Sequence, residues 1–286
     1  MGAERAQIVS VQNPRVKEWQ QLLERKGRER TGLFLVEGIH MVKEALKHGA
    51  DVRVVAYSMD RGVPAELAAW SEDASARGGG ADSEPPEWVQ VSEAVITKCS
   101  DAQTPQAVFA VLGKPPYEAE TLLRSSASLV VVVDGVQDPG NLGTIIRSAD
   151  AVGATGVVLG RGTVDLYNPK TLRATMGSLF HIPVIEAELP ELLRHARERG
   201  IQLVNTSLQA TASCYDTDLR GATWIVVGNE GKGVSPEVSE LVNLHVIVPI
   251  HGKAESLNVA MATTVLLYEA LRQREYSNNN SSCPPT

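Results

Sequence analysis

The spacing of apolar residues divides the second half of the chain into buried strands and intervening helices. Apolar runs that read as strands recur near residues 129–133, 156–160, 182–186, 201–206, 223–227 and 245–249. Helical stretches lie between most of these runs. Strands that alternate with helices in this way form a mostly parallel sheet covered on both faces. The second half is therefore predicted to be an α/β domain.

The first half shows the same alternation on a smaller scale. Predicted strands lie at 33–38, 52–58, 88–92 and 106–112, and helices are expected at 13–30, 40–48, 64–77 and 93–100. Lys114-Pro115-Pro116 interrupts this pattern in the way that is typical of a domain boundary. We therefore expect a first domain over 1–113, a linker over 114–128, a second domain over 129–275 and a disordered polar tail over 276–286.

Two glycine-rich turns follow the carboxyl ends of predicted strands, where open α/β sheets bind their ligands. The turns are G-N-E-G-K-G at 228–233 and H-G-K-A-E-S at 251–256. We expect Asn141 to cap the helix that carries Arg147, and Ser256 to cap the last helix. That last helix is apolar around most of its circumference, which indicates packing on several sides.

Composition narrows the class of protein. The 286 residues are 43% hydrophobic, and no apolar run reaches the ~18 residues of a membrane span. The first ten residues lack the apolar core of a secretory signal, so a cytoplasmic location is expected. Cys99, Cys214 and Cys283 lie far apart, and the six histidines are scattered. We therefore expect no disulfide framework and no metal site, and His181 is expected to be packed rather than catalytic.

The net charge of −7 argues against a simple basic nucleic-acid binder, but the charge is unevenly distributed. Residues 1–59 hold ten Lys and Arg against seven Asp and Glu, whereas residues 60–93 hold two against eight. A basic surface on the first domain is therefore compatible with RNA binding. Runs of charged residues usually lie on solvent-exposed helix faces, so the charge distribution alone does not establish RNA binding.

Three long motifs in the second half carry a family resemblance. They are N-L-G-T-I-I-R-S-A-D-A-V-G-A from Asn141, G-N-E-G-K-G-V from Gly228 and V-P-I-H-G-K-A-E-S-L-N-V-A from Val248. In this order they resemble the signature motifs of the SpoU/TrmH family of RNA 2′-O-ribose methyltransferases. The resemblance implies a trefoil-knotted α/β methyltransferase domain, S-adenosylmethionine as cofactor, and a homodimer. It spans roughly residues 129–274.

The resemblance also implies roles for individual residues. The catalytic candidates are Arg147, Asn141, Glu230, Ser256 and Asn258. Each has a plainer explanation: Arg147 as a solvated charge, Glu230 as the ion-pair partner of Lys232 or Lys253, and the others as helix caps. Arginine keeps its proton in proteins, so we interpret Arg147 as a bidentate clamp on ribose or phosphate rather than a base.

The cofactor is expected to be held mostly by main-chain groups of the turns after the strands. Matching motif positions give the cofactor-binding candidates Thr206, Gly228, Val248, Ile250 and Leu257. From the sequence pattern alone, Val248 and Leu257 would be ordinary core residues. A P-loop, a G-x-G-x-x-G turn after the first strand and H-E-x-x-H are all absent from the sequence.

The first domain resembles the ribosomal-protein-L30-like RNA-binding domain that precedes the catalytic domain in many family members. The motifs are S-x-x-N-P-R-V-K from Ser10 and F-x-V-E-G from Phe34. Its basic residues are the RNA-binding candidates, namely Arg15, Lys17, Arg25, Lys26, Arg28 and Arg30. The predicted function is 2′-O-ribose methylation of RNA, with ribosomal RNA favoured. Transfer RNA, methylation of a base nitrogen, and a non-catalytic RNA-binding assembly factor are the alternatives.

Overall fold

The computed structural model describes residues 5–72 and 84–276. It divides into two compact units, the first formed by 1–116 and Asp165–His181, the second by Tyr117–Val164 and 182–286. Residues 277–286 of the tail predicted at 276–286 lie outside the described residues, as does part of the predicted helix over 64–77. Tyr276, the first residue of that tail, ends a π-helical turn, Arg272–Tyr276. The described part of that helix forms a short 3-10 turn, Ala65–Leu67, and the helix α4, Ala68–Glu72.

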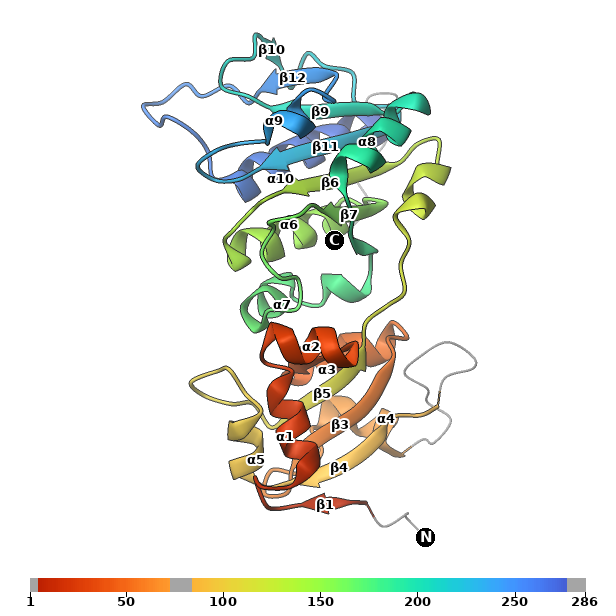
Figure 1. The fold of residues 1–286 in the computed structure, drawn as a ribbon, viewed down its shortest axis with the longest axis vertical. Helices are drawn as coiled ribbons and strands as arrows, with labels where there is room; N and C mark the ends of the chain where they lie inside the picture. The colour runs from red at the N-terminus through yellow and green to blue at the C-terminus, as the bar shows by residue number, and fades with distance from the viewer. Residues whose placement is uncertain (1–4, 73–83, 277–286) are drawn as a thin grey trace. The chain divides into compact units, whose positions relative to one another are not determined.

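The first unit contains a five-stranded sheet in the order β1-β4-β3-β5-β2 (Figure 1). The strands are β1 (Gln7–Ile8), β2 (Leu33–Glu37), β3 (Val52–Ser58), β4 (Glu87–Val91) and β5 (Val108–Gly113). β5 runs antiparallel to both β2 and β3, so the sheet is mixed. The helices of this stretch are α1 (Pro14–Gln21), α2 (Arg25–Thr31), α3 (Ile39–Lys47) and α5 (Glu93–Lys98).

The first unit also includes a segment from far along the chain. Asp165–His181, which the sequence places in the second domain, forms α7 (Pro169–Thr175) and a 3-10 turn, Ser178–Phe180. α7 packs on β2, and the Tyr167 ring lies 4.6 Å from the Phe34 ring between centroids. The Lys114 ammonium lies 4.7 Å from the centre of the Tyr167 ring, a favourable cation–π distance. The chain therefore passes between the two units at 116/117, 164/165 and 181/182.

The second unit is built on a seven-stranded sheet in the order β10-β12-β9-β11-β6-β7-β8 (Figure 1). Its strands are β6 (Leu129–Asp134), β7 (Gly156–Leu159), β8 (Val184–Glu186), β9 (Gln202–Thr206), β10 (Ala212–Ser213), β11 (Thr223–Gly228) and β12 (Leu244–Ile247). Every pairing between neighbouring strands is parallel. The prediction of an α/β fold with a parallel sheet is confirmed.

Helices cover this parallel sheet because both of its faces are apolar. They are α6 (Pro139–Ala151), α8 (Leu189–Glu198), α9 (Pro236–Ser239) and α10 (Val259–Leu271). α8 and the region of α9 share one core cluster with alternate residues of β6 and β11. α10 packs against α6 and β11, and Ser148 and Thr264 join these two helices by a 2.8 Å hydrogen bond between their hydroxyl oxygens. This arrangement places the starts of α6 and α10 beside the carboxyl ends of the central strands.

Candidate active site

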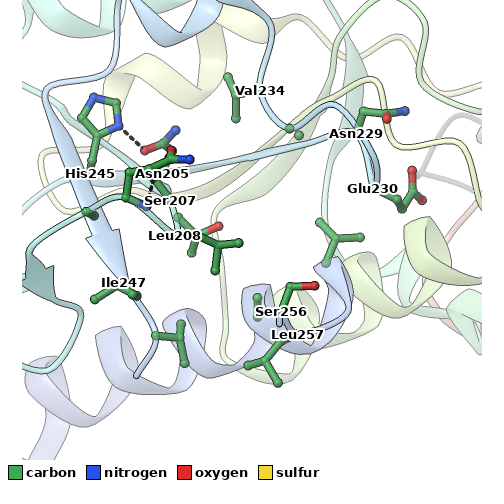
Figure 2. A pocket seen from close by; sticks show the side chains of 18 of the residues that line it. Asn205, Ser207, Leu208, Asn229, Glu230, Val234, His245, Ile247, Ser256 and Leu257 are labelled. Carbon is green, nitrogen blue, oxygen red and sulfur yellow. Dashed lines mark hydrogen bonds between the residues drawn. The ribbon is translucent and has the colours of Figure 1, made fainter. Parts of the chain in front are cut away.

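A cavity of about 1000 Å³ lies at the carboxyl ends of β9, β11 and β12 (Figure 2). Its walls are formed by the end of β9 and the loop that follows it (205–210), by the end of β11 and its glycine turn (228–234), and by the start of α10. Ile247 at the end of β12, with Val248 and Ile250 beyond it, completes the wall. Figure 2 shows Asn229 and Glu230 on one side of the cavity and Asn205 and His245 on the other. This is the position in which parallel α/β sheets bind ligands.

The glycine turn after β11 can form only with a glycine at its first position. A Cβ atom on Gly228 would lie 2.1 Å from the carbonyl carbon of Gly233, so any side chain would push the main chain apart. Asn229 and Gly233 pair across the turn through two main-chain hydrogen bonds of 2.9 Å. The Asn229 side chain completes the turn, because its oxygen accepts the N–H groups of Gly231 and Lys232. The turn is therefore rigid, and its shape is set by the sequence.

All five residues proposed from the sequence to bind a cofactor line this cavity. They are Thr206, Gly228, Val248, Ile250 and Leu257. The loop from Ile250 to Leu257 has no regular structure, and its main-chain N–H groups form no hydrogen bond within the described part of the chain. Donors of this kind are available to a ligand. Leu257 is 41% exposed, so its apolar side chain is also free to contact one.

The two helix starts beside the cavity differ from the sequence-based prediction. Asn141 is not the cap of α6: the helix begins earlier, and the Asp138 carboxylate accepts the Asn141 N–H at 2.9 Å. Pro139 explains the shift, because its fixed φ angle favours the first helical position. Ser256 is likewise not the cap of α10. That role belongs to Asn258, whose side-chain oxygen accepts the N–H groups of Ala260 and Met261.

Because Asp138 takes the capping role, the Asn141 side chain is free to join two other elements. Its amide nitrogen donates to Glu230 Oε1 at 2.9 Å, and its oxygen accepts from the Asn258 amide at 2.9 Å. Glu230 also accepts the main-chain N–H groups of Gln137 and Asp138, at 3.0 and 3.1 Å. Asn258, Asn141 and Glu230 therefore form one chain of hydrogen bonds that links α10, α6 and the glycine turn.

The electrostatics of Glu230 follow from these contacts. Partial burial raises the pKa of Glu230, but the hydrogen bonds from Asn141, Gln137 and Asp138 lower it more, so it lies below its ordinary value of 4.5. The carboxylate is thus ionised at neutral pH, and its charge is held beside the start of α6, where the helix dipole favours an anion. It pairs with neither Lys232 nor Arg147 in the described residues.

Arg147 lies outside the cavity wall, on an exposed position of α6. It is six residues beyond Asn141, which is about 9 Å along the helix axis. Its neighbour Ser148 faces α10, so Arg147 flanks the contact between the two helices. No hydrogen bond or ion pair of its guanidinium is found among residues 5–72 and 84–276. Ser256 lines the cavity, and its hydroxyl is also without a hydrogen bond in that part of the chain.

The RNA-binding candidates of the first unit fall into three kinds. Arg15 pairs with both carboxylate oxygens of Glu87, and Arg25 pairs with Glu29 at 2.6 Å. Lys17 and Lys26 are exposed, and Arg30 contacts only the uncharged Gln21. The charges of these last three side chains are not used by a carboxylate in the described residues.

Arg28 is the third kind, and the sequence-based assignment of this residue as an RNA contact is wrong. Its side chain is 3% exposed, and it forms an ion pair with Asp165 while donating to the Leu22 carbonyl oxygen at 2.6 Å. An arginine that is enclosed in this way cannot reach a phosphate. Its role is to fix Asp165, and with it the segment Asp165–His181, within the first unit.

Sequence reasoning missed part of the cavity wall. The loop residues Ser207 and Leu208 line it, and His245 Nδ1 lies 2.6 Å from Asn205 Oδ1 at its edge (Figure 2). The signal was present, because this loop directly follows the strand that ends at Thr206, and such loops carry ligand contacts in parallel sheets. The three sequence motifs lie outside this loop.

Comparison with known proteins gives a consistent result for both halves of the chain. The SpoU rRNA Methylase family matches residues 128–268, and the MRM3-like substrate binding domain matches residues 13–110. The 23S rRNA (guanosine(2553)-2′-O)-methyltransferase RlmP of Bacillus subtilis is 38% identical over 262 residues, which cover 92% of this chain and 98% of the relative. The 23S rRNA (uridine(2479)-2′-O)-methyltransferase of Streptomyces viridochromogenes is 33% identical over 277 residues, covering 94% of this chain and 93% of that protein.

A solved structure agrees with these relatives. The crystal structure of an AdoMet-bound rRNA methyltransferase from Sinorhizobium meliloti superposes with a TM-score of 0.81 at 32% identity, covering 96% of this chain and 100% of that one. This chain belongs to the SpoU rRNA methylase family, as its three motifs predict. No helix within the described ranges is both long and apolar enough to cross a membrane.

Proposed function

We propose that this protein transfers a methyl group from S-adenosylmethionine to a ribose 2′-hydroxyl of ribosomal RNA. The observation that carries the proposal is the cavity at the carboxyl ends of β9, β11 and β12. Its wall includes every residue that the motifs assign to cofactor binding. Asn141, on the helix that carries Arg147, is connected to this wall by two hydrogen bonds: it donates to Glu230 and accepts from Asn258. The similar proteins named above are 23S rRNA 2′-O-methyltransferases.

The cavity fits the cofactor in its chemistry. An adenosine needs main-chain donors and acceptors for its base edge and apolar groups for its base faces. The unbonded N–H groups from Ile250 to Leu257 supply donors, and Val248 and Leu257 supply apolar surface. Gly228 keeps the turn open, because a side chain there would collide with Gly233. When bound, the cofactor supplies a methyl group that its sulfonium already activates, so no metal is needed for this step.

The chain's own residues then have to orient the ribose and manage its proton. Arg147 donates no hydrogen bond within residues 5–72 and 84–276 and lies outside the cofactor cavity, where an RNA substrate rather than the cofactor would meet it. A guanidinium can hold ribose or phosphate oxygens in a bidentate manner and stabilise the developing 2′-alkoxide. The hydrogen bonds among Asn141, Glu230 and Asn258 hold α6 and α10 in place beside Arg147. The Ser256 hydroxyl can form a hydrogen bond with the substrate. Positioning of this kind can lower a barrier by ~7–11 kcal/mol.

The first unit is proposed to bind the RNA through Lys17, Lys26 and Arg30, whose charges no carboxylate neutralises in the part of the chain that the structure describes. An enzyme that acts on ribosomal RNA in this way belongs in the cytoplasm. A homodimer is also part of the proposal. Met261 and Tyr268 lie seven positions apart on one face of α10 and are 52% and 50% exposed. An apolar face of this kind on an otherwise packed helix is typical of a subunit contact.

The first experiment asks what the protein methylates. Labelled S-adenosylmethionine is incubated with the protein and total RNA, and the RNA is then digested to nucleosides. Label is expected on 2′-O-methylated ribose in ribosomal RNA. Label on a base would contradict the proposed reaction, and label on transfer RNA alone would contradict the proposed substrate. An absence of label on RNA would contradict the methyltransferase activity.

The second experiment tests the cavity itself with a matched pair of glycine variants. Gly228→Ala is expected to abolish cofactor binding measured by calorimetry, because its Cβ would lie 2.1 Å from main-chain carbon. Gly231→Ala lies in the same turn, but its Cβ would meet only the Asn229 side chain, at 3.7 Å. It should therefore bind the cofactor nearly as well as the unmodified protein. Equal affinities for the two variants would contradict the placement of the cofactor.

The dimer is tested by light scattering. The unmodified chain is expected to be a dimer at micromolar concentration, and Met261→Asp with Tyr268→Asp is expected to shift it towards monomer, because buried charges without partners are costly. Leu208→Asp is the control, since Leu208 is 59% exposed and lies on the loop after β9 rather than on α10. A stable monomer for the unmodified chain would refute this part of the proposal.

A further inference from the structure

Three side chains that can bind a metal meet on the surface of the first unit. Glu44 lies on α3, His48 follows its last turn, and His181 ends the segment Asp165–His181. Both histidines direct Nε2 at the same carboxylate oxygen, Glu44 Oε2, at 3.3 Å from His48 and 3.0 Å from His181. The two imidazole rings lie 4.2 Å apart between centroids. Nothing in the methyl-transfer chemistry requires this cluster.

The distances suit a tetrahedral ion. Zinc binds histidine nitrogen at about 2.0–2.1 Å and carboxylate oxygen at about 2.0–2.2 Å, which places neighbouring ligand atoms about 3.4 Å apart in a tetrahedron. The two nitrogen-to-oxygen distances, 3.0 and 3.3 Å, are close to this value. All three ligand atoms lie within 4.8 Å of one another. The three ligand atoms are therefore already close enough together to approach one ion.

The local structure brings the segment unusually close to Glu44. A Cβ atom on Gly177 would lie 2.8 Å from Glu44 Cγ, so a glycine is required where the segment passes α3. His40, one turn before Glu44, holds the same segment through its Nε2, which lies 2.9 Å from the Met176 carbonyl oxygen. His40 is thereby occupied, which leaves Glu44, His48 and His181 as the converging set.

The three side chains differ in their exposure to solvent. The Glu44 side chain is 13% exposed, while His48 and His181 are 33% and 26% exposed. The anion is thus sheltered and the two imidazoles stay accessible to an ion from solvent.

We propose that Glu44, His48 and His181 form a binding site for a divalent transition metal ion, with zinc the best match. Two imidazoles and one carboxylate form a ligand set that zinc uses with water in the fourth position. Each imidazole would bind the ion through Nε2. Its single ring proton would then lie on Nδ1, so the imidazole would remain neutral when the ion is bound. The ion would fasten His181 to α3 and so hold the segment Asp165–His181 in the first unit. It is a structural site, and it is independent of the methyl-transfer reaction.

The test uses the full-length protein after treatment with a chelator and its removal. Calorimetry with zinc chloride is expected to show binding of one ion per chain with a dissociation constant of about 1 μM or lower. Cobalt chloride should give the visible absorption of tetrahedral Co²⁺, and zinc should raise the melting temperature. An absence of heat and of cobalt absorption would overturn the proposal.

Variants locate the ion. His48→Ala, His181→Ala and Glu44→Gln should each weaken zinc binding by more than about 10-fold, since even partners behind the ligands have effects of that size. His195→Ala, an exposed histidine on α8 of the second unit, should leave the affinity unchanged. The increase in melting temperature with zinc should disappear in the first three variants only. Zinc binding that survives His48→Ala and His181→Ala would place the ion elsewhere and refute the site.

Discussion

Two arginines on helices have opposite surroundings in the structure. Arg28 on α2 of the first unit is enclosed, with a partner in Asp165 and another in the Leu22 carbonyl. Arg147 on α6 of the second unit is exposed and has no hydrogen-bond partner among the described residues. In the sequence, both are simply basic residues on predicted helices. The structure indicates that one maintains the fold and the other has donors left for a substrate.

The same contrast extends to the two units. In the first unit, most arginines form ion pairs with carboxylates, as in the pairs Arg15–Glu87 and Arg61–Glu93. In the second unit, polar groups gather at the ends of parallel strands, and the side chains of Arg147 and Ser256 form no hydrogen bond within the described ranges. Unused capacity at a cavity is a sign of function, whereas a paired and buried charge is a sign of structure.

Removing the guanidinium of Arg147 should have the largest effect. Arg147→Ala is expected to lower the rate of methyl transfer by about 10²–10³-fold, the usual cost of losing one donor to a developing oxyanion. Its melting temperature should stay close to that of the unmodified protein, because the side chain is exposed. Cofactor affinity should also persist, since Arg147 does not line the cavity. Single-turnover assays and calorimetry measure the two quantities.

Arg147→Lys separates a clamp from a simple charge. A lysine keeps the charge but cannot hold two oxygens in a fixed plane, so this variant should be nearly as inactive as Arg147→Ala. Full activity in the lysine variant would show that a point charge suffices. The bidentate clamp would then have to be abandoned.

Removing Arg28 should affect stability and leave chemistry in place. Arg28→Ala leaves the Asp165 carboxylate without its ion-pair partner. Breaking a buried ion pair lowers the free energy of unfolding by about 3–5 kcal/mol. Urea unfolding measures this loss. Arg25→Ala is the matched control on the same helix, because its pair with Glu29 is exposed and should contribute less than about 1 kcal/mol. Equal destabilisation by the two variants would contradict the structural role of Arg28.

Much of the fold could be predicted from the sequence because its signals are local. The six apolar runs of the second half correspond to β6, β7, β8, β9, β11 and β12, and the pattern also indicated a parallel sheet. The caps were harder to assign. Asn, Ser and Asp are all good caps, so the choice between Asp138 and Asn141 depended on where Pro139 starts the helix. The five motif positions assigned to the cofactor all lie on the wall of one cavity, and their role in binding it stays a prediction.

Long-range pairing could not be predicted in the same way. Arg28 and Asp165 are 137 positions apart in the sequence, and no local pattern predicts their contact. The assignment of Asp165–His181 to the first unit depends on such contacts. A fragment that starts at residue 117 would therefore carry the buried residues Leu166, Tyr167 and Leu172 without the rest of the first unit. The His40, Glu44, His48 spacing did hold a signal, because residues four apart share a helix face.

Charge reversal at the unpaired cations should have a moderate effect. Lys26→Glu with Arg30→Glu is expected to weaken RNA binding by about tenfold and to reduce the salt dependence, as the loss of phosphate contacts requires. Cofactor binding should not change, because both residues lie in the other unit. Arg53→Glu is the control, since Arg53 already pairs with Asp51 in the same unit. Filter binding at several salt concentrations measures the affinity and the salt slope. An unchanged salt slope in the double variant would remove α2 from the RNA interface.

The smallest effect is expected from Glu230 and depends on pH. Because the hydrogen bonds hold its pKa below 4.5, the ionised carboxylate contributes stability that is fully present above 4.5 and is lost as the pH falls through the lowered value. Glu230→Gln keeps the shape of the side chain but removes the charge from the start of α6. The unmodified protein should therefore be more stable than the variant at pH 7, by less than about 1 kcal/mol for so exposed a group.

The difference between the two proteins should stay constant from neutral pH down to about pH 5 and shrink below it. Urea unfolding of both proteins across this range measures the difference. Glu237→Gln, which removes an exposed acid from α9 of the same unit, is the control for the loss of one negative charge. A difference that grows on acidification would mean that Glu230 is strained rather than stabilised by Asn141 and the start of α6. The chain of hydrogen bonds from Asn258 through Asn141 would then not hold the two helices in register, and Arg147 would need another element to position it.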